Sequence, residues 1–148
     1  MQTILEKTGR IFLAVSAALV LLPGCNVQPP ASAGPMLRVR IRDFKIQPAR
    51  ASLAEGPVSL SVWNAGPSTH EFVIVQSDRS PDELPLGADG LSVDEDAVEP
   101  IDELTEVEAK TRGTLALSLP PGRYVLFCNL EGHYLAGMHA ALEVRGDD

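Results

Sequence analysis

The strongest constraint on the fold is an alternation of apolar and other residues with a period of two, repeated along most of the chain after residue 36. In LRVRIR, residues 37–42, every second residue is apolar and an arginine follows each one. The alternation recurs in VSLSVW, HEFVIV, LALSL, RYVLFC and MHAALEV. Because successive side chains of a strand point to opposite faces, each segment predicts a strand with one face in a core.

Turn-forming residues separate these segments, as in Ala65-Gly66-Pro67 and Pro120-Pro121-Gly122. Short strands with regular turns and no clear amphipathic helix are typical of an all-β fold, here a Greek-key antiparallel β-sandwich. A chain of 148 residues has room for one such domain. We place this domain at residues 37–146.

An acidic segment interrupts the pattern. Residues 78–108 contain twelve Asp or Glu and one Arg, with Pro and Gly between them. Its first half predicts a long surface loop, and AVEPIDELTEVEA in its second half fits either a strand or a short helical turn. The segment is either a solvated excursion or an acidic docking face for a basic redox partner.

The N-terminus predicts an export signal over residues 1–24. Lys7 and Arg10 precede a twelve-residue apolar run, 11–22, which is shorter than the roughly 20 residues that span a bilayer. The following LPGC resembles a bacterial lipobox, which predicts lipidation of Cys25. The alternatives are an ordinary signal peptide cut nearby and a disulfide between Cys25 and Cys128. The lipoprotein interpretation places the domain outside the cytoplasm, in the periplasm or at the cell surface, anchored to a bacterial membrane.

Residues 25–36 are rich in Pro, Ala and Ser and predict a tether between this anchor and the domain. The net charge of −8 argues against nucleic acid as a partner, because phosphate binding needs a basic face. We expect a monomer whose partners are redox proteins, basic ones if the acidic segment is a docking face, and the membrane.

The stretch CNLEGHYLAGMH, residues 128–139, gathers rare donor side chains. The chain has two Cys, three His and three Met, and this stretch holds one, two and one of them. A thiolate and an imidazole suit copper, and a weak thioether suits a copper ion that changes oxidation state. Cys128, His133 and Met138 are therefore candidate ligands of one copper ion.

A trigonal copper site of two histidines and one cysteine needs a further histidine. His70 opens HEFVIV on the same face as Phe72 and Ile74, and Cys128 ends RYVLFC on the face of Tyr124 and Leu126. Two adjacent strands would thus bring His70 and Cys128 to one end of the sandwich. His139 has the opposite parity to Met138, so we exclude it as a ligand.

These motifs resemble those of the cupredoxins, the small blue-copper β-sandwich proteins, and most of all bacterial plastocyanin-like and sulfocyanin-like members. The matching segments are THEFVI, YVLFCN and GHYLAGM. The resemblance implies one type 1 copper ion, with His70, Cys128 and His133 as equatorial ligands and Met138 as a weak axial one.

Two positions depart from the family pattern. Glu71 stands where plant-type plastocyanins have an Asn that ties the ligand strands together. Glu131 stands where relatives often have a Pro before the Gly-His of the loop. A carboxylate there favours Cu(II), so we predict a lower reduction potential than in a Glu131→Pro variant.

The resemblance implies one-electron transfer between Cu(I) and Cu(II), without catalysis by this chain alone. A copper-storage or copper-delivery protein would use the same ligands, but the sequence after residue 25 has no Met-rich or His-rich tract. A copper oxidase or nitrite-reducing unit needs a second copper with additional histidines, and a binuclear centre needs two loop cysteines. Tyr134, Leu135 and Ala136 flank His133, and we expect them either to form an apolar patch around the edge of its ring or simply to pack within the loop.

Overall fold

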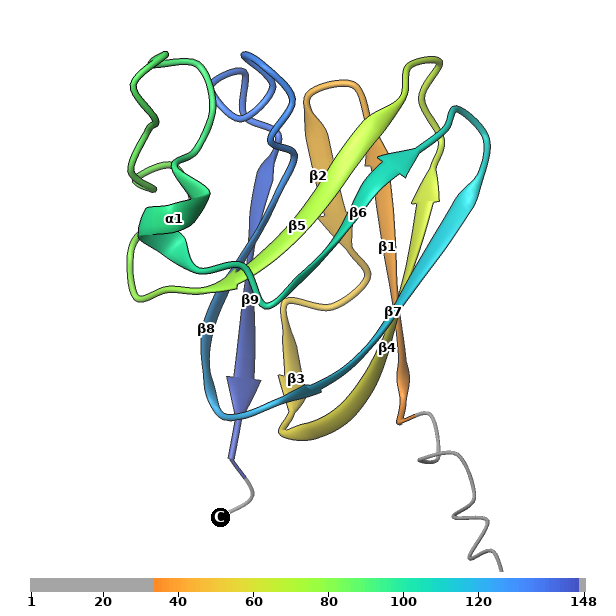
Figure 1. Ribbon diagram of the computed structural model, residues 1–148. Coiled ribbons are helices and arrows are strands. Elements are labelled where there is room, and N and C mark those ends of the chain that lie inside the picture. Colours follow the sequence, from red (N-terminus) through yellow and green to blue (C-terminus); the bar gives the residue numbers. More distant parts are fainter. Residues whose placement is uncertain (1–33, 147–148) are drawn as a thin grey trace, which may run out of the picture.

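The computed structural model describes residues 34–146, so the predicted signal peptide, Cys25 and most of the tether lie outside the described residues. Almost all of its regular secondary structure is β-strand, arranged in two sheets (Figure 1). The strands are β1 (Met36–Arg42), β2 (Lys45–Pro48), β3 (Ser52–Ala54), β4 (Gly56–Asn64), β5 (His70–Gln76), β6 (Asp102–Val107), β7 (Arg112–Leu119), β8 (Gly122–Phe127) and β9 (His139–Arg145). One short helix, α1 (Glu95–Val98), precedes β6. No helix in residues 34–146 has the length and apolar character to cross a membrane.

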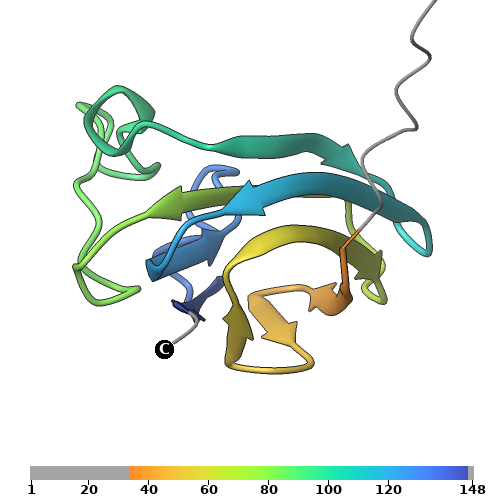
Figure 2. The same cartoon turned by 90° about the horizontal axis from the view of Figure 1, so that it is seen from below.

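The two sheets form the layers of a sandwich. One sheet has the order β2-β1-β4-β7 and the other β3-β9-β8-β5-β6. Figure 2, seen from below, shows the two layers curving around a shared interior. The predicted β-sandwich is confirmed, although the sheets are mixed, because β1 pairs with β4 and β3 with β9 in parallel. Alternation could not reveal this direction, since it is the same in parallel and antiparallel strands.

The main core lies between the sheets and follows the predicted faces. In β1, residues Leu37, Val39 and Ile41 are buried and the arginines between them are exposed. Phe72 and Ile74 of β5 meet Tyr124 and Leu126 of β8 in the same apolar cluster. Burying each large apolar side chain contributes about 1.5–3 kcal/mol.

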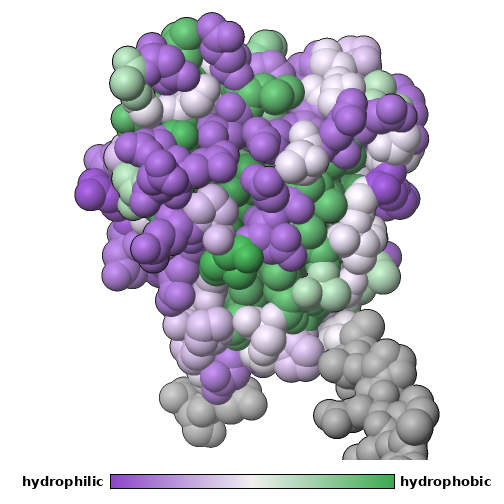
Figure 3. All heavy atoms as spheres, viewed as in Figure 1, coloured by the Kyte–Doolittle hydropathy of each residue, from purple (hydrophilic) through white to green (hydrophobic). Residues whose placement is uncertain are grey.

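A second apolar cluster lies on the outer side of the five-stranded sheet. Val73, Val75, Val125 and Phe127 form its floor, and the segment before β6 covers them with Leu84, Val93 and Val98. The prediction of a purely solvated excursion was therefore wrong for these apolar residues. The second half of the acidic segment combines both expected forms, since α1 is followed by β6. Hydrophilic side chains dominate the surface around α1 and β6 (Figure 3).

Candidate metal centre

The pairing of β5, β8 and β9 brings three of the predicted donors to one end of the sandwich, at the top of Figure 1. β5 and β8 are antiparallel, with Val73 opposite Phe127, so the start of β5 meets the end of β8. β9 pairs with β8 with His139 opposite Phe127, so the residues just outside this pair, Cys128 and Met138, are neighbours. The Cys128 N–H donates to the Met138 carbonyl over 3.0 Å.

The β8–β9 loop returns His133 toward this end through tight turns. His133 N–H donates to Leu130 O, and Met138 N–H donates to His133 O over 3.1 Å. Gly132 and Gly137 have φ values of 78° and 93°, which L-residues with a side chain adopt only with strain. These two glycines thus allow the loop path that places His133.

His70, Cys128 and His133 converge on one point. The Cys128 Sγ lies 4.0 Å from Nδ1 of His70 and 3.5 Å from Nδ1 of His133. Bonds of about 2.0 Å to nitrogen and about 2.3 Å to sulfur, as found for zinc, would separate such donor atoms by roughly 3.5–3.7 Å at tetrahedral or trigonal angles. One metal ion of this size therefore fits among the three donors.

Met138 is fully buried and belongs to the same apolar cluster as Cys128. Its main chain is bonded to both Cys128 and His133, so its position is fixed relative to these two donors. A thioether in this place suits the weak axial position of a copper site. Ligation by the four side chains remains a prediction.

Asp43 orients the buried histidine. β1 and β2 are joined by the two-residue turn Asp43–Phe44, and the Asp43 Oδ1 lies 3.0 Å from Nε2 of His70. Burial lowers the pKa of His70 below its usual value, although the bond to Asp43 opposes this effect. A neutral imidazole that donates its Nε2–H to Asp43 keeps Nδ1 unprotonated, facing the thiol. This carboxylate–histidine pairing is typical of metal ligands.

The sulfur is set up as a metal ligand and not as an exposed nucleophile. Cys128 is a free thiol with no exposed surface. Burial raises its pKa, while the backbone N–H groups of Leu130 and Glu71 lower it by donating toward Sγ. A bound cation would favour the thiolate further. The alternative of a Cys25–Cys128 disulfide stays a prediction, because Cys25 lies outside the described residues.

Glu71, which stands where plant-type plastocyanins have an Asn, follows His70 and lies beside Cys128. Its backbone N–H donates toward the Cys128 sulfur, and its carboxylate accepts the backbone N–H of Asn129. Partial burial, together with Glu95 and Glu103, raises the pKa of Glu71 to about 7. The Glu71 carboxylate thus lies beside the residue that follows Cys128. Glu131 is exposed, and its effect on the potential stays a prediction.

The surroundings of His133 differ in part from the expected apolar patch. Leu135 is 52% exposed and the ring of Phe44, itself 53% exposed, meets the His133 ring edge-on with centroids 5.4 Å apart. Tyr134 was wrongly placed in the patch, because it is buried and its hydroxyl donates to Pro81 O and accepts from Leu84 N–H. The predicted exclusion of His139 agrees with its position against Tyr134, on the side away from the donors.

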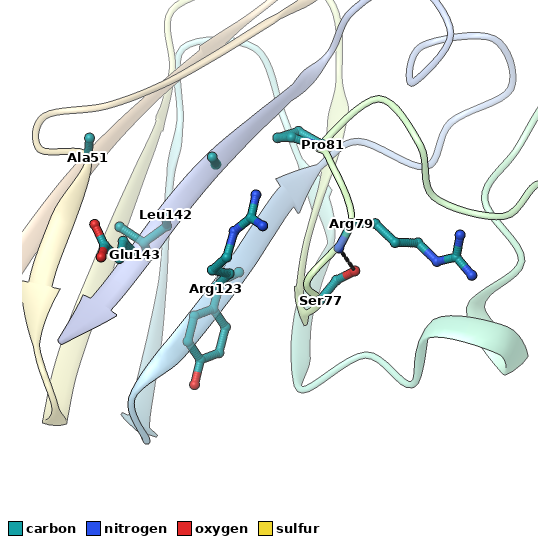
Figure 4. A pocket seen from close by; sticks show the side chains of 9 residues that line it. Ala51, Ser77, Arg79, Pro81, Arg123, Leu142 and Glu143 are labelled. Carbon is teal, nitrogen blue, oxygen red and sulfur yellow. Dashed lines mark hydrogen bonds between the residues drawn. The ribbon is translucent and has the colours of Figure 1, made fainter. Parts of the chain in front are cut away.

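A hollow of about 440 Å³ opens elsewhere, along β8 and β9 and the start of the acidic segment. Figure 4 shows Arg79, Arg123 and Glu143 around it. None of the four predicted donors lines it, so it does not extend the metal centre into a substrate pocket.

Comparisons with known proteins support the fold and the site. No family model and no curated protein matches the sequence. Among solved structures, auracyanin B is 25% identical with a TM-score of 0.58, and the match covers 78% of this chain and 92% of that protein. Auracyanin A of Chloroflexus aurantiacus, a "blue" copper protein, is 18% identical with a TM-score of 0.55, covering 76% of this chain and 100% of its own. Reduced rusticyanin is 13% identical with a TM-score of 0.54, covering 74% and 79%.

Auracyanins and rusticyanin are cupredoxins, and their structures match that of the present chain. This chain also brings two histidines and a cysteine together at one end of the sandwich. The chain has the cupredoxin fold. The resemblance suggested by its sequence motifs is confirmed, and His70, Cys128, His133 and Met138 form a cluster like a type 1 copper site. Within this cupredoxin fold the donor set fits one type 1 copper ion.

Proposed function

We propose that this cupredoxin is a mononuclear blue-copper protein that carries single electrons outside the cytoplasm. The observation that carries the proposal is the convergence of His70, Cys128 and His133 at distances that fit one metal ion. A bound copper ion would supply the redox chemistry by cycling between Cu(I) and Cu(II). The protein's part is to hold the donors in one geometry for both states, so that little rearrangement accompanies electron exchange.

The burial of the donors favours electron transfer over copper delivery. His70, Cys128 and Met138 have no exposed surface, and only His133 reaches the exterior, beside Phe44. An electron can pass through the edge of His133, whereas release of the ion would require the β8–β9 loop to open. Catalysis is not part of the proposal. The other group of side chains in residues 34–146 that are close enough to hold a metal ion is Glu71, Glu95 and Glu103, and it offers none of the histidines of a second copper site.

The proposal extends to location and partners. The apolar run 11–22 and the LPGC sequence support export and attachment to a bacterial membrane through Cys25. We further propose a monomer, and a basic redox partner for the acidic segment, whose Glu95 carboxylate accepts a hydrogen bond from the side chain of Asn129 at the start of the β8–β9 loop. Tyr134 fixes this segment to the loop.

The test is a redox titration of the purified protein with one equivalent of copper, followed by a challenge with a strong Cu(I) chelator. We expect one electron per copper, full reversibility, and retention of copper over the hours of a chelator challenge. Rapid loss of copper to the chelator, with no reversible cycle, would favour copper delivery and contradict electron transfer.

A further inference from the structure

The four-stranded sheet has a charge opposite to that of the whole chain. Strands β1, β2, β4 and β7 contain no Asp or Glu, although the chain carries a net charge of −8. The outward positions of these strands carry five exposed cations, half of the ten Lys and Arg in residues 34–146. We call these five residues the basic face: Arg38, Arg40, Arg42, Lys45 and Arg112.

The strand register arranges the basic face around one tryptophan. Arg40 lies opposite Trp63, and Trp63 lies opposite Arg112. The guanidinium of Arg112 stands 4.8 Å from the centre of the Trp63 ring, which orients it. The ion pairs within residues 34–146 are His70–Asp43 and Arg145–Glu143, so the five cations have no carboxylate partner there.

The basic face reaches the metal centre at its upper edge. Arg42 and Lys45 flank the turn whose Asp43 bonds His70 and whose Phe44 contacts His133. A hollow of about 430 Å³ lies at this edge, and its lining includes Arg40, Arg42, Lys45, the Asp43–Phe44 turn and residues 65–67. The one carboxylate at the hollow, that of Asp43, is already bonded to His70.

We propose that the basic face docks an acidic redox-partner protein, with the partner's one-electron centre placed against the β1–β2 turn. The proposal rests on the electron-transfer function proposed above. One electron passes between the copper and the partner's centre, so that one is oxidised as the other is reduced. The part of the acidic segment up to α1 lies on the other side of the β8–β9 loop from the β1–β2 turn (Figure 1). A partner therefore meets positive charge on one side of the loop and negative charge on the other, and this orients it.

The position of the cations favours a protein over an anionic membrane. A bilayer surface would need only charge, whereas a redox partner must bring its centre close to the histidines. Three of the five cations lie at the hollow beside the turn that contacts both histidines. The exposed Phe44 ring at this place offers an apolar contact at the centre of a charged rim, as in transient protein interfaces.

The first test needs no electron transfer. We would add hexacyanochromate(III), a redox-inert trivalent anion, to the protein with and without Cu(I) and follow the broadening of backbone amide NMR signals. Broadening should centre on the amides of residues 40–45 and vanish in Arg42→Glu/Lys45→Glu. Broadening spread evenly over the surface, or unchanged in the double variant, would overturn the proposal. Because this measurement also works without copper, its failure is distinct from failure of the proposed function.

The second test is the rate of electron exchange with an acidic and a basic c-type cytochrome in stopped flow. The Arg42→Glu/Lys45→Glu variant should lose about tenfold or more in rate with the acidic cytochrome at low ionic strength, and salt should reduce this difference. The matched controls change exposed arginines near the opposite end of the domain. Arg50→Glu is the single control, and Arg50→Glu/Arg145→Glu changes the net charge by the same amount as Arg42→Glu/Lys45→Glu. An equal loss in this control pair would overturn the proposal.

Two further measurements, vesicle binding and sedimentation, use the same variants. Binding to phosphatidylglycerol vesicles that depends on Arg42 and Lys45, with cytochrome rates unchanged, would overturn the proposal in favour of a membrane surface. Self-association in sedimentation that the double variant abolishes, again with unchanged rates, would overturn it in favour of a second copy of this chain. An unchanged visible spectrum in the variants is expected, since neither residue touches a donor.

Discussion

His70 stands at the start of a strand between two others and is fully buried, whereas His133 stands in a loop and is partly exposed. Their nitrogens both face the Cys128 sulfur. His70 is oriented by the carboxylate of Asp43, and His133 by turns at Gly132 and Gly137 and by the ring of Phe44. One region of the centre is thus fixed by the sheet and closed to solvent, and the other is fixed by a loop and open to partners.

Replacing each histidine in turn by glycine should reveal the difference between these two regions most strongly. Both variants lose a donor and, with it, the visible band of the copper site. Added imidazole should restore a band in His133→Gly, because the space it leaves reaches the surface, but not in His70→Gly, whose space is buried. Absorption spectra during an imidazole titration provide the measurement. Equal rescue of both variants would refute the distinction between the two regions.

Variants of Asp43 should weaken the fixed region. Asp43→Ala removes both the charge and the acceptor of the His70 Nε2–H, and we expect copper affinity to fall about 10–100-fold. Asp43→Asn keeps an acceptor and loses only the charge, so the affinity loss should be smaller and the reduction potential should rise. Competition with a chelator and a spectroelectrochemical titration measure the two effects. A lower potential in Asp43→Asn would contradict the electrostatic role.

Tyr134→Phe probes the loop region without touching a donor. The variant removes the hydroxyl that accepts from Leu84 N–H and donates to Pro81 O. An unsatisfied buried N–H costs about 1–3 kcal/mol, so the free energy of unfolding in urea should fall by that amount. The potential should change little, because Tyr134 faces away from the copper donors. Loss of the copper band with unchanged stability would be inconsistent with this assignment.

The pH dependence of stability should reveal Glu71. Its folded-state pKa of about 7 lies above the usual value of 4.5, so the folded protein holds a proton that the unfolded chain releases. This contribution to stability is complete below pH 4.5 and is lost as the pH rises through 7. Glu71→Gln should therefore reduce the loss of stability between pH 5 and pH 8. The control Glu131→Gln, at an exposed position of the loop, should leave that difference as in the natural protein.

The sequence predicted the fixed region well because strand alternation carries long-range information. Once HEFVIV and RYVLFC are strands of one sheet, parity alone places His70 and Cys128 on the core face, and antiparallel pairing places them at the same end. Gly132 and Gly137 take positive φ values in the turns of the loop, a conformation that favours glycine.

Other features had no local signal. Asp43 lies 27 residues before His70, and a single Asp in a short turn is common without any bonded partner. Leu84 and Val93 cover the second apolar cluster from an irregular segment, where no period distinguishes buried from exposed residues. The burial of Tyr134 depends on that same segment. The two wrong predictions, a solvated acidic segment and an exposed Tyr134, therefore have one cause.

The central claim is that His70, Cys128, His133 and Met138 hold one copper ion, and the visible absorption spectrum tests it most directly. One equivalent of Cu(II) is added to the purified protein and to Cys128→Ser. The account predicts an intense thiolate-to-copper band in the natural protein that reductant bleaches and oxidant restores, and no such band in Cys128→Ser. Absence of the band in the natural protein, or an unchanged band in the variant, would contradict the account.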